Sequence, residues 1–357
     1  MENKITNHNI QALRALAILL VIIQHLHRLP VPEWLMSTYS SASYWGGVDI
    51  FLAISGFLMC KSLDNEIRKH GRTHTAFYYF FMKRVFRLIP ALLTWAIICI
   101  FIAYLISPYG NAGIDKSINT FIYSLLGVSN IYYFNETTLG HPYDPLLSVT
   151  WSLSLEWQLY LVLSLLAIVL KKPFFCLSLI AVIIFSSIFL PNGVNHQETI
   201  GWWIRPQAFF LGSLLYLLNH LIKKIVINKF LNLLLGCTAV YSLVFYTSLV
   251  SPTYKLAYVG ILGAAIFMLV AINMPPFKSR YLDWIGDRSY SIYLCHIPVM
   301  IITRLSLDHL LSGSIFAGSS ILYIAVFCLI TAIFSNASYK YIEQPFINFY
   351  RRKEVTK

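Results

Sequence analysis

Long runs of apolar residues constrain this chain more than any other feature of its sequence. A run of about 20 apolar residues lets a helix cross the roughly 30 Å of hydrocarbon in a bilayer. Such runs recur along the 357 residues, of which 57% are hydrophobic and only 12% are charged. A soluble domain usually carries about twice that charged fraction. The sequence therefore predicts an all-α, polytopic membrane protein.

Ten runs are predicted to span the membrane, near residues 10–28, 45–62, 85–107, 151–170, 173–190, 202–219, 230–249, 254–273, 288–306 and 314–335. An eleventh run, near 119–134, is shorter and rich in Asn, Ser, Gly and Tyr. Lys and Arg concentrate in cytoplasmic loops, and with ten spans and a cytoplasmic N-terminus 21 of the 27 Lys and Arg residues lie on that side. A crossing at 119–134 would invert every later loop. We therefore expect this run to be a re-entrant or surface helix on the outer side, and both termini to be cytoplasmic.

The net charge of +12 does not indicate a nucleic-acid partner, because the basic residues form short clusters between apolar runs. The six cysteines are scattered without metal or redox spacing, so we expect no metal and no permanently bound cofactor. The first apolar run lacks a small-residue cleavage site and is predicted to be a span rather than a signal peptide. We expect residues 1–357 to form one integral-membrane domain, with 351–357 as a short basic cytoplasmic tail.

Ionisable residues inside a membrane span cost at least a few kcal/mol, so each needs a physical reason. Arg14 and His25 lie in the first predicted span, eleven residues apart. At about 100° per residue they share one helix face, separated by about 16 Å along the axis. Arg14 lies toward the cytoplasmic end and His25 toward the outer end. From the residues alone, two interfacial side chains that reach the headgroups explain the pattern equally well.

Two carboxylates are predicted at a depth similar to that of His25. Asp49 and Glu156 each lie about 7 Å inside the outer end of their helices, and Glu156 follows Ser152 by one turn. A carboxylate that orients a histidine, which then removes a proton from an alcohol, suits transfer of a group to a hydroxyl. The sequence does not decide which acid would orient His25. A hydrogen bond to a neighbouring helix is the alternative role for Asp49.

Arg84 and Arg87 lie one helical turn apart at the cytoplasmic end of the third span, so both can face one anion. Guanidinium groups suit phosphates, although positive membrane anchoring explains the pair equally well. His296, about 12 Å from the inner end of its helix, is a further candidate, with core packing as the alternative. Glu343 is expected to be a cap or a lid residue at the cytoplasmic end of the last span.

Six sequence elements, in order along nearly the whole chain, resemble the motifs of membrane-bound acyltransferase family 3. This family includes bacterial O-antigen and exopolysaccharide O-acetyltransferases. The elements are Arg14 with His25, residues 46–57, Arg84 with Arg87, residues 151–156 (WSLSLE), residues 290–298, and residues 343–345 (EQP). One departure is Trp157, which follows Glu156 where relatives often have a second acid.

The resemblance implies an enzyme of the bacterial cytoplasmic (inner) membrane that transfers an acyl group, usually acetyl, from acyl-coenzyme A. The implied acceptor is a hydroxyl of a cell-surface or lipid-linked polysaccharide such as O-antigen. Coenzyme A would be a donor substrate rather than a resident cofactor. The catalytic candidates are His25, Arg14, Glu156 and Asp49, and the donor-binding candidates are Arg84, Arg87 and His296. Some members carry an extra esterase-like domain, and we expect this domain to act without one, alone, as a homo-oligomer or with a polysaccharide-assembly partner.

A transporter or flippase for a polysaccharide precursor is the main alternative, because it too would carry polar residues at mid-depth. Such proteins more often show inverted repeats or matching broken helices, and the sequence shows neither. A scaffold in a polysaccharide-assembly complex is the third alternative. A transfer or hydrolysis assay with acetyl-coenzyme A separates the enzyme from both.

Overall fold

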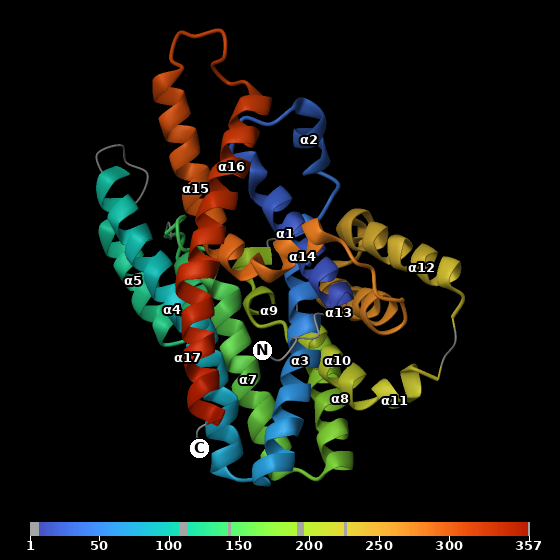
Figure 1. Cartoon of the computed structure of the whole chain (residues 1–357). Coiled ribbons are helices and arrows are strands. Elements are labelled where there is room, and N and C mark those ends of the chain that lie inside the picture. The colour runs from blue at the N-terminus through green and yellow to red at the C-terminus, as the bar shows by residue number, and fades with distance from the viewer. Residues whose placement is uncertain (1–6, 107–112, 142–143, 191–195, 225–226, 356–357) are drawn as a thin grey trace. The chain divides into compact units, whose positions relative to one another are not determined.

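All regular secondary structure is helical in the part of the chain that the computed structural model describes, residues 7–106, 113–141, 144–190, 196–224 and 227–355 (Figure 1). The longer helices are α1 (His8–His25), α3 (Gly47–His70), α4 (His74–Ile106), α7 (Thr150–Val169), α8 (Lys172–Phe189), α12 (Lys229–Tyr241), α13 (Pro252–Phe267), α15 (Ser289–Leu310) and α16 (Ser320–Ser338). The shorter helices are α2 (Glu33–Thr38), α5 (Ile114–Leu125), α6 (Ser129–Thr138), α9 (Ile200–Trp203), α10 (Gln207–Leu217), α11 (Asn219–Ile222), α14 (Arg280–Asp287) and α17 (Gln344–Val355). The predicted all-α class is confirmed.

Nine helices within those residues are long and apolar enough to cross a bilayer, which confirms a multi-pass membrane protein. They correspond to nine of the ten predicted runs. The remaining run, 202–219, is divided between α9 and α10, and the 11 residues of α10 rise only about 17 Å. Pro206 causes the break, because proline lacks a backbone N–H and disfavours helical backbone at the residue before it.

Large apolar side chains point outward from the long helices. On α8, more than half of the surface of each of six such residues is exposed: Phe174, Leu177, Ile184, Phe185, Ile188 and Phe189. In water these faces would need a protein partner, whereas lipid tails solvate them directly. The hydrophobic excess of the sequence therefore lies largely on the outer faces of the helices.

The eleventh run forms a hairpin of the two short helices α5 and α6. Gly127, with φ of 70°, lies in the turn between them. Tyr123 stacks on Tyr132, with ring centroids 4.5 Å apart, and this contact holds the arms together. The arms have 12 and 10 residues and rise about 18 and 15 Å, well short of the roughly 30 Å of hydrocarbon. The hairpin agrees with the expectation that this run does not cross, and its place on the outer side stays a prediction.

The internal contacts divide the chain into two compact units, and α1, α3 and α7 each contribute residues to both. Unit 1 comprises Met1–Gln24, Ser40–Asn65 and Leu159–Ser289, and unit 2 comprises His25–Tyr39, Glu66–Gln158 and Tyr290–Lys357. The organisation as one domain stays a prediction.

In unit 1, glycines bring helix backbones into direct contact. A Cβ atom added at Gly56 of α3 would lie 1.8 Å from the carbonyl oxygen of Phe209 on α10, and one added at Gly212 of α10 would lie 2.1 Å from that of Ala53 on α3. No side chain fits at either place unless the backbones separate. Small residues at such crossings are typical of membrane helices, which associate through close packing rather than the hydrophobic effect.

In unit 2, α17 packs against α4 through ion pairs and a stacked pair of aromatic rings. Lys83 Nζ lies 2.8 Å from Glu66 Oε1 and 2.7 Å from Glu354 Oε1. Phe86 stacks on Tyr350, with ring centroids 5.0 Å apart. Residues 351–355, which were expected to belong to a short basic tail, therefore continue the α17 helix. A lysine between two carboxylates gives this last helix a fixed place on α4.

Replacing Gly56 with Ala should lower the stability of the folded protein by about 1–3 kcal/mol, as overpacking does in a tight core. The measurement is the thermal unfolding midpoint in detergent. Gly236→Ala is the matched control, because a Cβ atom at that helical glycine meets nothing nearer than 3.7 Å. Equal midpoints for the two variants would contradict the close contact between α3 and α10.

Candidate active site

Helix α1 carries the first two candidate residues on one unbroken helix. It runs from His8 to His25, so Arg14 and His25 lie in the same 18-residue element. The predicted shared face and axial separation of about 16 Å therefore apply to a regular helix. Both side chains are half-buried. His25 ends the helix and precedes a short 3₁₀ turn, Leu26–Arg28.

His25 lies against His296 of α15 in unit 2. The Nδ1 atom of His25 is 3.2 Å from the Nε2 atom of His296, and the two ring centroids are 5.1 Å apart. His296 is fully buried, and its Nδ1 atom lies 2.8 Å from the Tyr293 carbonyl oxygen. The structure places the imidazole of His296 at Nδ1 of His25. A carboxylate that orients His25, and donor binding by His296, stay predictions.

The start of α7 is connected to this pair through Tyr293. The Tyr293 hydroxyl lies 2.7 Å from Ser152 Oγ and donates a hydrogen bond to the Val149 carbonyl, 3.1 Å away. Its backbone carbonyl in turn faces His296. Three of the elements that carry the resemblance, residues 151–156, residues 290–298 and His25, thus meet in unit 2.

Glu156 lies one turn after Ser152 on α7 and is half-buried. The nearby Tyr290 donates a hydrogen bond to the Leu88 carbonyl, 2.8 Å away. Glu156, Glu343 and Arg87 are the ionisable side chains nearest in influence to its hydroxyl. Glu343 is buried and accepts a hydrogen bond from Ser291, so it is tied to α15 as well as to the end of the last span. The catalytic role of Glu156 stays a prediction.

Asp49 is held in unit 1 by Arg205, which was not among the predicted site residues. Its Oδ2 atom lies 3.7 Å from Nη1 of Arg205, and both side chains are almost completely buried. The Arg205 guanidinium lies over Trp202, 4.3 Å from the ring centroid, and over Trp45, 4.9 Å away. The signal was the segment 202–206 (WWIRP), in which an arginine follows two tryptophans and directly precedes the proline between α9 and α10.

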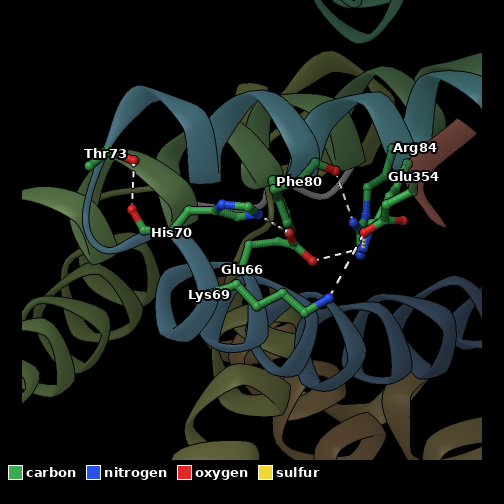
Figure 2. A network of polar contacts seen from close by, with 8 residues as sticks. Glu66, Lys69, His70, Thr73, Phe80, Arg84 and Glu354 are labelled. Atoms are coloured by element: carbon green, nitrogen blue, oxygen red, sulfur yellow. Dashed lines mark hydrogen bonds and ion pairs between the residues drawn. The ribbon is translucent and has the colours of Figure 1, made fainter. Parts of the chain in front are cut away.

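Arg84 and Arg87 lie near the contact between α4 and α17, and Figure 2 shows the polar network around Arg84. Arg84 is buried, donates a hydrogen bond to the Phe80 carbonyl at 2.9 Å, and lies 4.3 Å from the centroid of the Phe80 ring. Glu66 in the same network is buried beside Lys83. Arg87 is half-buried and more accessible than Arg84. The two arginines therefore have different surroundings, and their contact with a donor phosphate stays a prediction.

Breaking the buried pair of Asp49 and Arg205 should be costly, because one charge would be left buried alone. Arg205→Ala is expected to lose about 3–5 kcal/mol of stability. The double variant with Asp49→Ala should lose less than the sum of the two single variants. Thermal unfolding in detergent measures the stability of the wild-type protein, the two single variants and the double variant, which together form a double-mutant cycle. Arg304→Ala is the control, because its pair with Asp308 is half exposed and such pairs contribute about 0–1 kcal/mol. Additive losses would contradict a direct interaction.

The fold defines the class of protein first: an all-helical, multi-pass membrane protein, with nine helices in its described residues long enough to span a bilayer. Residues 7–339 match the family model described as "Acyltransferase domain", so the chain belongs to this acyltransferase family. The resemblance seen in the motifs is thereby confirmed.

Curated relatives share this sequence over most of the chain. O-acetyltransferase OatA of Staphylococcus aureus (strain NCTC 8325 / PS 47) is 27% identical over 94% of this chain and 56% of its own length. Peptidoglycan O-acetyltransferase OatA of Listeria monocytogenes serovar 1/2a is 26% identical over 96% of this chain and 57% of its own length. The chain thus spans about half the length of these relatives. No solved structure matches it.

Proposed function

We propose that this chain is an O-acetyltransferase of the bacterial cytoplasmic membrane, which transfers an acetyl group from acetyl-coenzyme A to a hydroxyl of a cell-surface glycan. The observation that carries the proposal is the contact of His25 with His296, in a chain that belongs to an acyltransferase family. The names of two relatives as O-acetyltransferases support the choice of a hydroxyl acceptor.

The chemistry assigned to His25 is general base catalysis. Its imidazole accepts the proton of the acceptor hydroxyl while the hydroxyl oxygen attacks the thioester carbonyl carbon. The carbon–sulfur bond then breaks, and the coenzyme A thiolate receives that proton from His25. The products are the acetyl ester and free coenzyme A, so no oxidant or further reactant is required.

The donor is proposed to enter from the cytoplasm, because its charged nucleotide end cannot enter hydrocarbon cheaply. Arg84 and Arg87 are the proposed contacts for its phosphates. Arg14 lies on the same face of α1 as His25, about 16 Å away. An extended pantetheine arm that passes Arg14 would bring the thioester toward His25, near the outer face.

Two glycans are the candidate acceptors. The sequence motifs resemble enzymes that act on O-antigen and other surface polysaccharides, and one relative is named a peptidoglycan O-acetyltransferase. Mass analysis of both glycans, from cells with and without the gene, distinguishes them by a difference of one acetyl unit. A difference in neither glycan would contradict the proposed acceptor class.

His25→Ala should lower the rate of acetyl transfer by about 10²–10⁴-fold, the usual contribution of a general base. Coenzyme A binding should be largely retained, because the nucleotide contacts are proposed elsewhere. The purified protein is assayed for transfer and, by calorimetry, for donor binding. His27→Ala is the matched control, since this histidine is exposed and lies two residues away. Equal activity of the His25→Ala and wild-type proteins would exclude His25 as the base.

Arg87→Gln should weaken donor binding, and raised salt should reproduce part of the effect by screening the phosphate contact. Arg87 is the better of the two arginines to test, because Arg84 also packs on Phe80 and its loss would disturb α4. Lys171→Gln, at another predicted cytoplasmic end, is the control. An unchanged dissociation constant for acetyl-coenzyme A in Arg87→Gln would exclude this contact.

Oriented vesicles test the route of the two substrates. We expect the donor to be used only from the cytoplasmic face and the acceptor only from the opposite face. Transfer with both substrates on the cytoplasmic face alone would contradict the route through the membrane and leave the acyltransferase function standing.

A further inference from the structure

The hydrogen bonds around His296 determine which of its nitrogens carries the proton. Its Nδ1 atom lies 2.8 Å from the Tyr293 carbonyl oxygen and 3.2 Å from the Ile292 carbonyl oxygen. A carbonyl oxygen only accepts hydrogen bonds, so Nδ1 of His296 must be the N–H donor. In a neutral imidazole the other nitrogen, Nε2, then carries the lone pair and accepts.

The same logic extends to His25. Because Nε2 of His296 is an acceptor, the hydrogen bond of 3.2 Å between the rings is donated by Nδ1 of His25. The basic lone pair of neutral His25 is therefore on its Nε2 atom. One tautomer of His25 satisfies this contact, and the other would set two lone pairs against each other.

The surroundings of His296 hold its ring in this state. The residue is fully buried, and its proton donor contact is with the backbone of its own helix, α15. Tyr293, which supplies the nearer carbonyl, is anchored to α7 through Ser152 and the Val149 carbonyl. A ring fixed by backbone carbonyls cannot easily exchange the roles of its two nitrogens.

We propose that His296 is a positioning residue for acetyl transfer: it accepts the Nδ1 proton of His25 and thereby presents Nε2 of His25 as the base. The inference rests on the proposed function and deepens it. When Nε2 takes the hydroxyl proton, His25 becomes an imidazolium that still donates from Nδ1 to His296. His25 returns the Nε2 proton to the coenzyme A thiolate, and His296 neither gains nor loses a proton.

A neutral imidazole differs from a carboxylate in this position. It supports the transient positive charge of His25 through one hydrogen bond without itself being a buried charge. Burying a charge costs far more than burying a hydrogen-bonded neutral group. The arrangement therefore suits a histidine at the end of a membrane helix, where an acid would need further partners.

Three substitutions at His296 test whether the hydrogen-bond acceptor at Nε2 is required, as distinct from the volume and the backbone contact of the side chain. The amide oxygen of Gln can occupy the place of Nε2 and accept from His25. The amide of Asn reaches only the place of Nδ1, so it can keep the backbone contact but offers His25 no acceptor. Leu fills a similar volume with neither group.

The experiment measures kcat and the KM for acetyl-coenzyme A in detergent-purified full-length protein, with the thermal midpoint of each variant. We expect His296→Asn and His296→Leu to lose about 10²-fold in kcat, at the lower end of the usual contribution of a general base. The KM for acetyl-coenzyme A should not change. His296→Gln should keep most of the activity.

Similar kcat values for His296→Gln and His296→Asn, or an active His296→Leu, would overturn the inference. If His296→Leu fails to fold, the comparison of Gln with Asn still decides. A rise in KM at unchanged kcat would instead make His296 a donor-binding residue. Absence of acetyl transfer by the wild-type protein would contradict the proposed function itself. An inactive His25→Ala protein together with a fully active His296→Asn protein would contradict only this inference.

Discussion

Polar groups inside hydrocarbon have no water to bond with, and this constraint governs both the fold and the candidate site. Helices satisfy it for the backbone, and the described residues form no other regular structure. Side chains satisfy it locally. His296 donates to a carbonyl of its own helix, and the charge of Asp49 faces Arg205, which lies over two tryptophans. The His296 ring thus has a fixed orientation, which is what a group beside a catalytic base requires.

The spans could be predicted because hydropathy depends on local sequence. Nine predicted runs are long helices, and the tenth, 202–219, is divided at Pro206, whose effect on the backbone is also local. The positive charges at 351–353 resembled a tail, yet the helix continues there because Lys83 holds Glu354. That contact joins residues far apart in the sequence, and no local pattern reveals it.

The residues of the candidate site could be predicted largely from the sequence, but the contacts between them could not. The eleven-residue spacing places Arg14 and His25 on one face of a helix, and α1 is continuous between them. The partner of His25 is 271 residues away, and its identity depends on how α15 is rotated. The sequence predicted a carboxylate to orient His25 and gave no sign that a second histidine lies beside it. Arg205 was not predicted as a site residue for a related reason: it is buried, and it lies against Trp45, which is far from it in the sequence.

The glycines of unit 1 have a consequence for motion. Backbone meets backbone where Gly56 and Gly212 lie, and the Cβ that Gly263 lacks would lie 3.0 Å from the Asp49 carbonyl oxygen. Helices in such contact are interlocked, because sliding one past the other would drive Cβ atoms of neighbouring residues into carbonyl oxygens. Shear between packed helices is one of the two common ways in which domains open and close. In unit 1 it is blocked along α3, α10 and α13, so any opening there must come from hinge movements at the ends of these helices.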